Sequence, residues 1–506
     1  MIRSLSAVGC LFLLPSVFAV PSATVTAPAV KVYDFYTQHC PPLPQPGCAT
    51  DIDKGCDCDI SDAPLRFWFN GTNIFGLGSV DLGSRAYAGS TVDEVHHTCY
   101  IYANSTNNMD ITAFDNHEWI HSSVFFPENN TVYALTHNEY HCDREGCPCY
   151  PNCDGIPASQ LGFLTGVTLM QSMDGGLSWA HSRPPPYHSV AVFPYAWNIS
   201  LGRNPGYYGF RSPSSIVKSR MDDGYYYATV TAAWGSNELG QQAGACMMRT
   251  RDVTDPTSWL AWGGSSFNIS LYENPWLNPT IDPALHRCIP FTNTTYASLL
   301  WSTLYNSYIY FGTHNGDDDG GWWFSLSKDL ITWSDWTMLT VPDNYLPVGG
   351  NGTITPPPPN MTMPGRFIMR NTSGNGEIWW EDPTKTFKYG VGTCTICPET
   401  NACQLYVKVS DSEFDNLINR TEFSCGLIGW NATGISHLYY PTLIDSSSPS
   451  LANANFDSIG SEGTLFLVSQ RCVSASGNGN GISCSPFDVN GLLVRDMIKV
   501  PITFST

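Results

Sequence analysis

The sequence predicts an all-β protein, and two observations support this fold class. Short apolar runs bounded by Gly, Asn and Asp recur along the chain, and after the first twenty residues no 3.6-residue apolar period persists for three turns. Five β-rich stretches also end alike, at Asp93, Asp174, Asp252, Asp329 and Asp496, with intervals of 81, 78, 77 and then 167 residues. A repeat of this length, closed by Asp and often by Trp, predicts the blades of a β-propeller.

Strand signals divide residues 62–503 into five predicted blades. The strands expected for them are LRFWFNG, RAYAG and HTCYIYA; EWIHSSVFF, TVYALTHNEY and VTLMQSMDGGLSW; SSIVKS, DGYYYATVTAAW and ACMMRTRDVTDPTSW; ASLLWSTL, SYIYFGT and WWFSLSKDLITW; and YYPTLID, TLFLVS and GLLVRDMIKV. Turns such as PENN and DDG precede the middle strands, as an antiparallel meander requires. Closure of the last blade against the first would remove an exposed sheet edge.

Residues 340–437 break this pattern. They contain a PPPP run, several glycosylation sequons, and Cys394, Cys397, Cys403 and Cys425 among short strand signals. We expect a disulfide-stapled, Cys-rich insertion here, which leaves a five-bladed propeller. The alternative is a degenerate sixth blade closed by Asp411.

The first 19 residues predict a secretory signal peptide, with one basic residue, an apolar stretch and a small residue at Ala19. Residues 20–61 are rich in Pro, Cys and Asp and predict an N-terminal extension joined to the body by disulfides. Eleven sequons support a secreted, extracellular glycoprotein: Asn70, Asn104, Asn129, Asn198, Asn268, Asn293, Asn351, Asn360, Asn371, Asn419 and Asn431. Signal cleavage would leave 17 of the 18 cysteines, so one thiol is free or paired between chains, and the oligomeric state stays open.

Charge and composition exclude some partners. The formal net charge is −20, from 24 Lys and Arg against 44 Asp and Glu, so nucleic acid and anionic membranes are not expected partners. No later run of 18 apolar residues predicts a membrane span. Aromatic residues make up 13% of the chain, which suits stacking on sugar rings and equally suits a propeller core. We expect a carbohydrate substrate or ligand.

Two of the repeated turns resemble motifs of known propeller families. Residues 172–179, SMDGGLSW, resemble the Asp-box of sialidases, and residues 327–333, SKDLITW, resemble the S-x-D-L-x-x-W signature of five-bladed arabinanase-like and fructosidase-like glycoside hydrolases. In such a turn the carboxylate would cap backbone N–H groups while the Trp packs between sheets. The resemblance implies a role in the scaffold, away from the catalytic centre.

A propeller places its active site on one face, where the innermost strand of each blade begins and the second strand ends. This rule selects two catalytic candidates, Asp62 and Glu139. It also selects a set of substrate-binding candidates, with Asp445 nearby: Arg66, Glu118, His121, His141, Arg211, His437 and Tyr440.

Glycoside hydrolysis needs two carboxyl groups, about 5 Å apart for retention and up to about 9 Å apart for inversion. The resemblance to the five-bladed hydrolases implies that the base is an Asp just before the first innermost strand, and Asp62 in DAP matches it. Glu139 is the candidate acid, with Tyr140 and His141 beside it to hold it. The family's third Asp has no counterpart, because the matching segment RSPSS carries Arg211 instead. The function predicted is a secreted glycoside hydrolase-like activity.

Two alternatives remain open. A non-catalytic propeller would bind a glycan or a protein on the same face. A sialidase-like hydrolase would use Arg66, Arg85 and Arg211 to hold a substrate carboxylate and Tyr440 as the nucleophile.

No cofactor is predicted. His137, Glu139 and His141 alternate onto one strand face and could bind zinc with nearby thiolates, but disulfides are the favoured fate of those cysteines. Calcium at the NGDDDGG loop, residues 315–321, is the alternative to a solvated acidic turn. No phosphate-binding loop, dinucleotide fingerprint or Ser nucleophile elbow occurs in a strand-to-helix context.

Overall fold

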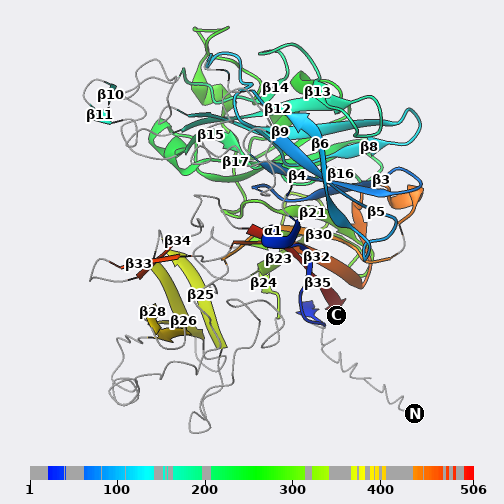
Figure 1. Cartoon of the computed structure of the whole chain (residues 1–506). Helices are drawn as coiled ribbons and strands as arrows, with labels where there is room; N and C mark the ends of the chain where they lie inside the picture. The colour runs from blue at the N-terminus through cyan, green and yellow to red at the C-terminus, as the bar shows by residue number, and fades with distance from the viewer. Residues whose placement is uncertain are drawn as a thin grey trace, which may run out of the picture.

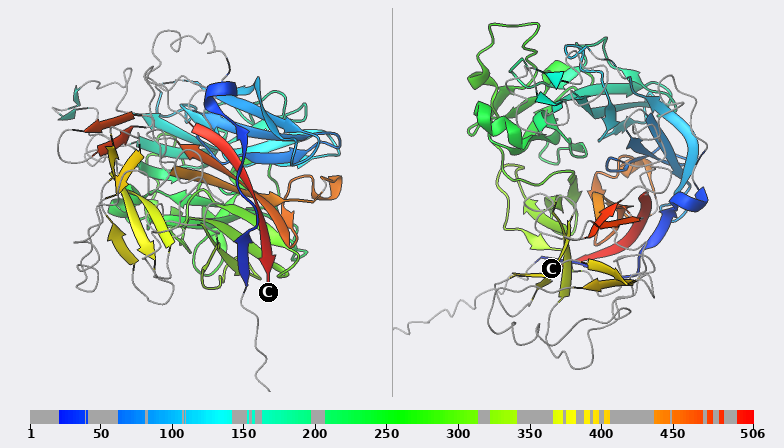
Figure 2. Two further views of the ribbon diagram at one scale, coloured as in Figure 1. Left: turned by 60° about the horizontal axis from the view of Figure 1, so that its bottom comes forward. Right: turned by 60° about the vertical axis from the view of Figure 1, so that its left-hand side comes forward.

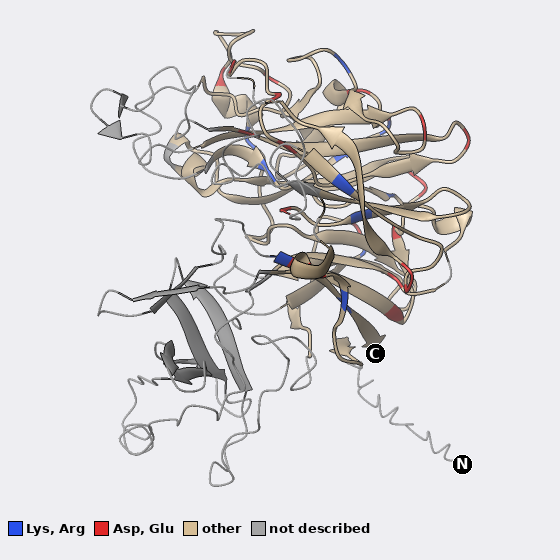
Figure 3. Ribbon diagram, in the orientation of Figure 1, with Lys and Arg blue, Asp and Glu red and all other residues tan. Residues whose placement is uncertain are grey.

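The computed structural model describes residues 21–38, 40, 62–80, 83–106, 108, 110–141, 163–196, 207–313, 322–340, 437–447, 449–470 and 495–506, and the backbone of short strands elsewhere. Its regular structure is nearly all strand, as Figure 1 shows, which confirms the all-β prediction. The described helices are α1 (Phe35–Gln38) and 3₁₀ turns at Trp234–Leu239, Pro256–Ser258, Pro283–His286 and Leu451–Asn453. Within the described residues, no helix combines the length and apolar character needed to cross a membrane. Lys and Arg are sparse on the described ribbon (Figure 3).

The main described strands form five antiparallel meanders, called meanders 1–5 in chain order. Meander 1 contains β3 (Arg66–Phe69), β4 (Ile74–Val80), β5 (Gly83–Gly89) and β6 (His96–Asn104). Meander 2 contains β7 (Glu118–Ile120), β8 (Val124–Phe126), β9 (Thr131–His141), β12 (Phe163–Ser172), β13 (Ala180–His181) and β14 (Ser189–Ala191). Meander 3 contains β15 (Tyr207–Arg211), β16 (Val217–Lys218), β17 (Tyr226–Ala232), β18 (Gly244–Thr250), β19 (Leu260–Trp262) and β20 (Phe267–Ser270). Meander 4 contains β21 (Ser298–Ser302), β22 (Ser307–Thr313), β23 (Trp322–Ser327) and β24 (Thr337–Met338). Meander 5 contains β30 (His437–Asp445), β32 (Glu462–Gln470) and β35 (Arg495–Ser505), together with β1 (Ser22–Val25) and β2 (Val30–Tyr33).

Neighbouring meanders are joined at their edges. β12 pairs in parallel with β15, which links meander 2 to meander 3, and β31 (Ser458–Ile459) pairs in parallel with β21 of meander 4. In the right-hand view of Figure 2 the meanders follow one another around a common centre. The arrangement is propeller-like, and the number of blades remains a prediction.

The N-terminal strands belong to the last meander. β1 pairs with β35 from Ser22 opposite Ser505 to Val25 opposite Ile502, and β2 continues along the same strand. The sequence analysis assigned residues 20–61 to an extension outside the propeller, because two strands of four residues each are too short to show a period. The structure instead places β1 and β2 on the outer side of meander 5. A disulfide from Cys40 to Cys99 then connects this segment to β6 of meander 1.

Packing between meanders 1 and 2 depends on a buried tryptophan. Trp68 of β3 is fully buried, and its Nε1 donates to the carbonyl of Gly175 at 2.9 Å. Trp179 meets it edge to face, with ring centroids 6.1 Å apart. Gly176 has φ of +101°, and a Cβ there would lie 2.1 Å from the Trp68 ring. Only glycine combines this conformation with this close approach.

The repeated aspartates at the ends of third strands stabilise turns. Asp174 accepts hydrogen bonds from the backbone N–H groups of Leu177 and Ser178 at 3.0 and 2.9 Å. Burial is the largest single effect and opposes ionisation, but the hydrogen bonds from Ser178, Ser172 and Leu177 together lower the pKa of Asp174 below its ordinary value. Asp329 likewise accepts from two backbone N–H groups, at 2.9 and 2.7 Å. The capping expected from the two motifs is therefore present.

The repeat is less regular than the sequence suggested. Asp252 lies in the equivalent turn of meander 3 and accepts from Thr254 N at 3.0 Å. Asp93 lies in the equivalent turn of meander 1, where its side chain is 96% exposed. Asp496 is different, because it lies within β35 and is 5% exposed, and it accepts the backbone N–H of Phe35 at 3.0 Å. Its assignment to an outer turn is wrong, since the DM in VRDMIKV continues a strand.

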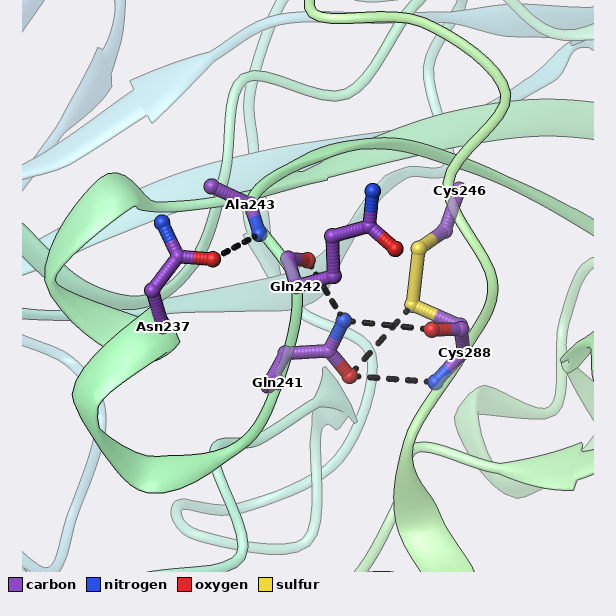
Figure 4. The surroundings of a disulfide bond; sticks show 6 residues. All are labelled: Asn237, Gln241, Gln242, Ala243, Cys246 and Cys288. Carbon is purple, nitrogen blue, oxygen red and sulfur yellow. Dashed lines mark hydrogen bonds between the residues drawn. A yellow bond between two sulfur atoms is a disulfide. The ribbon is translucent and has the colours of Figure 1, made fainter.

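A second disulfide stabilises meander 3. Cys246 of β18 pairs with Cys288, and Figure 4 shows the side chain of Gln241 beside the bond. Gln241 accepts the backbone N–H of Cys288 at 3.0 Å and donates to its carbonyl at 3.2 Å. The segment after β20 is thereby attached to β18 by a covalent bond and to the loop before β18 by two hydrogen bonds.

The remaining strands are described by their backbone alone. They are β10 (Asn152–Cys153), β11 (Ile156–Pro157), β25 (Arg366–Thr372), β26 (Asn375–Glu381), β27 (Lys388–Val391), β28 (Cys394–Cys397), β29 (Ala402–Leu405), β33 (Ser474–Gly477) and β34 (Ile482–Ser485). β25, β26 and β27 form one antiparallel sheet, and β28 pairs with β29. Asp411, the predicted signal peptide and the NGDDDGG loop lie outside the described residues. The insertion and the sixth blade both remain predictions for residues 340–437.

Candidate active site

Arg66 begins β3 at the point where the meanders converge. Its side chain donates from Nε to the carbonyl of His121 at 2.5 Å, from Nη2 to the carbonyl of Ala297 at 3.0 Å, and from Nη1 to Thr442 Oγ1 at 3.3 Å. These acceptors belong to meanders 2, 4 and 5 or precede their strands. Burial lowers the pKa of Arg66 to about 9, with nearby Tyr310 opposing the shift. Because these bonds go to protein groups, the contacts favour a role in joining meanders, and substrate binding by Arg66 stays a prediction.

Aromatic and histidine side chains from several meanders surround this point. The ring centroids of Tyr440 and Tyr296 are 4.7 Å apart, those of Tyr296 and His121 are 5.9 Å apart, and those of His121 and His137 are 5.3 Å apart. The guanidinium carbon of Arg211 lies 6.0 Å from the centre of the Tyr296 ring. We call these five residues the central ring. Three of them, His121, Arg211 and Tyr440, were predicted from the sequence as binding residues.

Asp62 contacts the central ring at Tyr440. Its Oδ1 accepts the phenol O–H of Tyr440 at 2.8 Å and forms an ion pair with Arg495. Burial and then the charge of Asp62 raise the pKa of Tyr440 well above its ordinary value. Burial alone would lower the pKa of Arg495, but Asp62 and Tyr440 raise it. The Asp62 side chain is 32% exposed, and its Oδ2 has no hydrogen-bond partner among the described residues.

Glu139 contacts the central ring at His137, on the side away from Asp62 along the chain of contacts. It is 8% exposed, and its Oε1 is 3.4 Å from Nε2 of His137. Its backbone N–H donates to the carbonyls of Asn116 and His117, both at 3.1 Å, which holds this end of β9 in place. Burial, followed by His137 and two arginines, lowers the pKa of His121 well below its ordinary value, so a neutral imidazole lies between the two ends of the ring.

Three residues at the starts of innermost strands have left-handed backbone conformations. Ser212, Tyr296 and Tyr440 have φ of 50°, 54° and 55° in meanders 3, 4 and 5. Each such conformation costs a residue other than glycine about 1–3 kcal/mol, and these conformations cluster at functional sites in proteins. Two of these three residues, Tyr296 and Tyr440, belong to the central ring.

Glu118, also predicted as a binding residue, makes its contacts elsewhere. It is 4% exposed and bonds to His181 Nε2 at 2.9 Å, and it accepts from Thr168 Oγ1 at 3.3 Å. These partners lie on the outer strands of meander 2. Burial opposes protonation of His181, but the hydrogen bond from His181 to Glu118 and the charge of Glu118 raise the pKa of His181 above its ordinary value. Burial and then His181 lower the pKa of His188 to about 3.

Two further predicted residues can be placed only by their backbone. His141 ends β9 opposite Phe163, and His437 begins β30 opposite Gln470. Their side chains lie outside the described residues. Both remain predictions as binding residues.

Three residues of this region were not predicted from the sequence: Arg495, Tyr296 and Thr442. Tyr296 stands two residues before β21, as in TYASLLWS, and the rule of innermost strand starts would have selected it if applied to the fourth blade. Arg495 begins the third strand of its meander, where that rule does not look. No sequence signal marks its pairing with Asp62.

No family model matches this chain, and no curated protein matches its sequence. Among solved structures, an exo-inulinase from Aspergillus awamori is 11% identical, with a TM-score of 0.30, over 90% of this chain and 99% of that one. An exo-β-1,3-galactanase from Phanerochaete chrysosporium is 9% identical, with a TM-score of 0.31, over 87% and 92%. A mutant Trypanosoma rangeli sialidase with trans-sialidase activity is 8% identical, with a TM-score of 0.34, over 95% of this chain and 60% of that one. Similarity at this level decides neither the blade number nor the reaction.

Proposed function

We propose that this chain is a secreted, N-glycosylated five-bladed β-propeller that hydrolyses glycosidic bonds in an extracellular carbohydrate. One observation carries the proposal. Asp62 and Glu139 lie at the two ends of one continuous set of side-chain contacts that runs through Tyr440, Tyr296, His121 and His137. The two carboxyl groups have unlike surroundings, as a division into base and acid requires.

Asp62 suits the part of the base or nucleophile. Arg495 and Tyr440 both donate to its Oδ1 and so fix the orientation of the carboxyl group. Oδ2 would then take a proton from water in an inverting reaction, or attack the anomeric carbon in a retaining one. Tyr440 keeps its proton, because its pKa is raised, and serves as a fixed donor.

Glu139 suits the part of the acid. It would donate its proton to the glycosidic oxygen as the bond to the anomeric carbon breaks, and the leaving group departs as an alcohol. His137 lies within reach of Oε1 and would orient the carboxyl group. Arg211 occupies the place of the expected third carboxylate, so oxocarbenium charge would have to be stabilised by Asp62 alone.

The structure offers one specific observation for a non-catalytic role. The ion pair between Asp62 and Arg495 neutralises the candidate base, and Arg495 is only 11% exposed. A propeller that only binds glycans would need aromatic and cationic groups without a reactive carboxylate, and Tyr296 with Arg211 would provide them.

A sialidase-like reaction has weaker support. The hydrogen bond from Tyr440 to Asp62 resembles a nucleophile with its base, but the raised pKa of Tyr440 favours the unreactive phenol. The described donors of Arg66 are also bound to protein groups. Arg211 is left as the candidate to hold a substrate carboxylate.

The proposal is tested with the secreted protein and a panel of α-arabinosides, β-fructosides, β-xylosides and sialosides. Asp62→Asn and Glu139→Gln should each lower turnover by about 10²–10⁴-fold. Asp93→Asn is the matched control, because its side chain is 96% exposed and lies outside the central ring. Full activity in both site variants would refute the assignment. Glycan binding by calorimetry with no turnover of any substrate would support the binding role instead.

A further inference from the structure

Meander 2 brings three side chains that can bind a metal ion together outside the central ring. Glu118 comes from β7, His181 from β13, and His188 immediately precedes β14. One ligand atom from each residue lies within 4.8 Å of the other two. Glu118 Oε2 is 2.9 Å from Nε2 of His181, and Oε1 is 3.9 Å from Nε2 of His188. None of the roles assigned to Asp62 and Glu139 uses this cluster.

A second observation points to a ligand. His188 is fully buried, and its Nε2 lies 3.1 Å from the carbonyl of Phe114, to which it donates. The other ring nitrogen, Nδ1, then carries a lone pair, and it has no hydrogen-bond partner among the described residues. Buried acceptors are almost always satisfied in folded proteins, so this nitrogen requires an explanation.

The surroundings match those of a metal ligand set. Histidines that bind metals usually donate their other N–H to a carbonyl or carboxylate, as His188 does to Phe114. Thr168 Oγ1 donates to Glu118 Oε1 at 3.3 Å, which orients the carboxylate in the same way. Both ligand types therefore have supporting hydrogen bonds.

The chemistry selects the ion. Bonds of 2.0–2.1 Å in a tetrahedral zinc site separate the ligand atoms by about 3.3 Å. One ligand atom from each of the three residues lies within 4.8 Å of the other two, so small side-chain movements would complete such a site. Two imidazoles and one carboxylate suit Zn²⁺, whereas Ca²⁺ and Mg²⁺ prefer ligand sets made of oxygen. The His181 side chain is 21% exposed, so water could reach a fourth position from its side.

We propose that Glu118, His181 and His188 form a zinc site that connects the outer strands of meander 2 to its innermost strand. The site goes beyond the proposed hydrolysis and does not depend on it. The competing explanation is an ion pair between Glu118 and His181 without a metal ion.

The test uses the full secreted chain, stripped with a chelator and dialysed against Zn²⁺ or, separately, Ca²⁺. Metal content is measured for the wild type, Glu118→Gln and His181→Asn, with His96→Asn as the control because His96 is exposed and outside the cluster. We expect the wild type and the control to hold one more zinc ion per chain than either site variant, at an affinity about 100-fold higher or more. We expect no retained calcium at the cluster. Equal zinc content and affinity in the wild type and Glu118→Gln would overturn the proposal.

Two further measurements guard against misfolded variants and zinc held by cysteine. Zinc should raise the thermal unfolding midpoint of the stripped wild type, since a ligand that binds only the folded state stabilises it. Cobalt bound to the wild type should show visible bands without the thiolate charge-transfer band that cysteine ligands produce. An unchanged midpoint, or a cobalt spectrum that contains only thiolate-bound metal, would favour the ion pair.

Discussion

Replacement of Arg66 by lysine separates a structural role from substrate binding. The guanidinium group of Arg66 serves three acceptors: the carbonyls of His121 and Ala297, and Thr442 Oγ1. The ammonium group of lysine is compact and would reach one of them, which leaves two buried acceptors unsatisfied. Each unsatisfied acceptor costs about 1–3 kcal/mol, so Arg66→Lys should lower the free energy of unfolding by about 2–6 kcal/mol although charge is conserved.

Denaturant unfolding followed by tryptophan fluorescence measures this loss as a lower midpoint at an unchanged slope. Arg183→Lys is the matched control, because Arg183 is 43% exposed and pairs with Asp255 at the surface, where the expected change is below about 1 kcal/mol. Wild-type stability in Arg66→Lys, together with weakened sugar binding, would refute the structural role. It would then support the substrate-binding role predicted from the sequence.

Three other predictions concern the scaffold. Gly176→Ala should destabilise the protein by at least about 2 kcal/mol in thermal unfolding, since the new Cβ would lie 2.1 Å from an indole ring at φ of +101°; wild-type stability would contradict that packing. Asp174→Ala should cost about 1 kcal/mol at pH 7, and Asp93→Ala, which removes an exposed carboxylate paired with Lys499 and no backbone cap, should cost less. The pKa of Asp174 in the folded protein is lowered. The stabilisation by its carboxylate is therefore present above the ordinary pKa of 3.8 and is lost as the pH falls through the pKa of the folded state. The unfolding midpoints of the wild type and Asp174→Ala should converge at that low pH. Replacing both Cys246 and Cys288 by alanine should cost about 4 kcal/mol by chemical denaturation, from the 42-residue separation, and an unchanged midpoint would show that the bond is absent in solution.

Most of the strands could be predicted because alternating apolar residues carry a local signal. Each expected strand of meanders 2–5 has an observed counterpart, whereas β4 was missed because IFGLGSV contains two glycines and a weak alternation. The strands β1, β2, β13, β14, β15, β19, β20 and β24 were also not predicted. The sequence also placed Asp496 with the turn residues. Asp496 was placed in a turn because it lies about two repeat lengths after Asp329. Such a spacing does not distinguish a turn from a strand, and Asp496 lies within β35.

Only the site residues marked by their position within a blade could be predicted from the sequence. Strand starts identified Asp62, His121 and Arg211, and the structure brings each of them to the central ring or its end. Arg495 bonds to Asp62 across 433 residues of sequence, and no local pattern encodes such a contact. Glu118 contacts His181 and Thr168, and these contacts could not be predicted because the start of a strand does not show which face its side chain takes.

The pairing of β1 with β35 has a consequence for biosynthesis. Ser22 and Ser505 are hydrogen-bonded across 483 positions, so the sheet they share cannot form until the ribosome has released nearly the whole sequence. Meanders 1–4 can assemble during synthesis, while an apolar strand with Ala23 and Val25 waits without its partner. The docking of this strand is therefore a late step in folding.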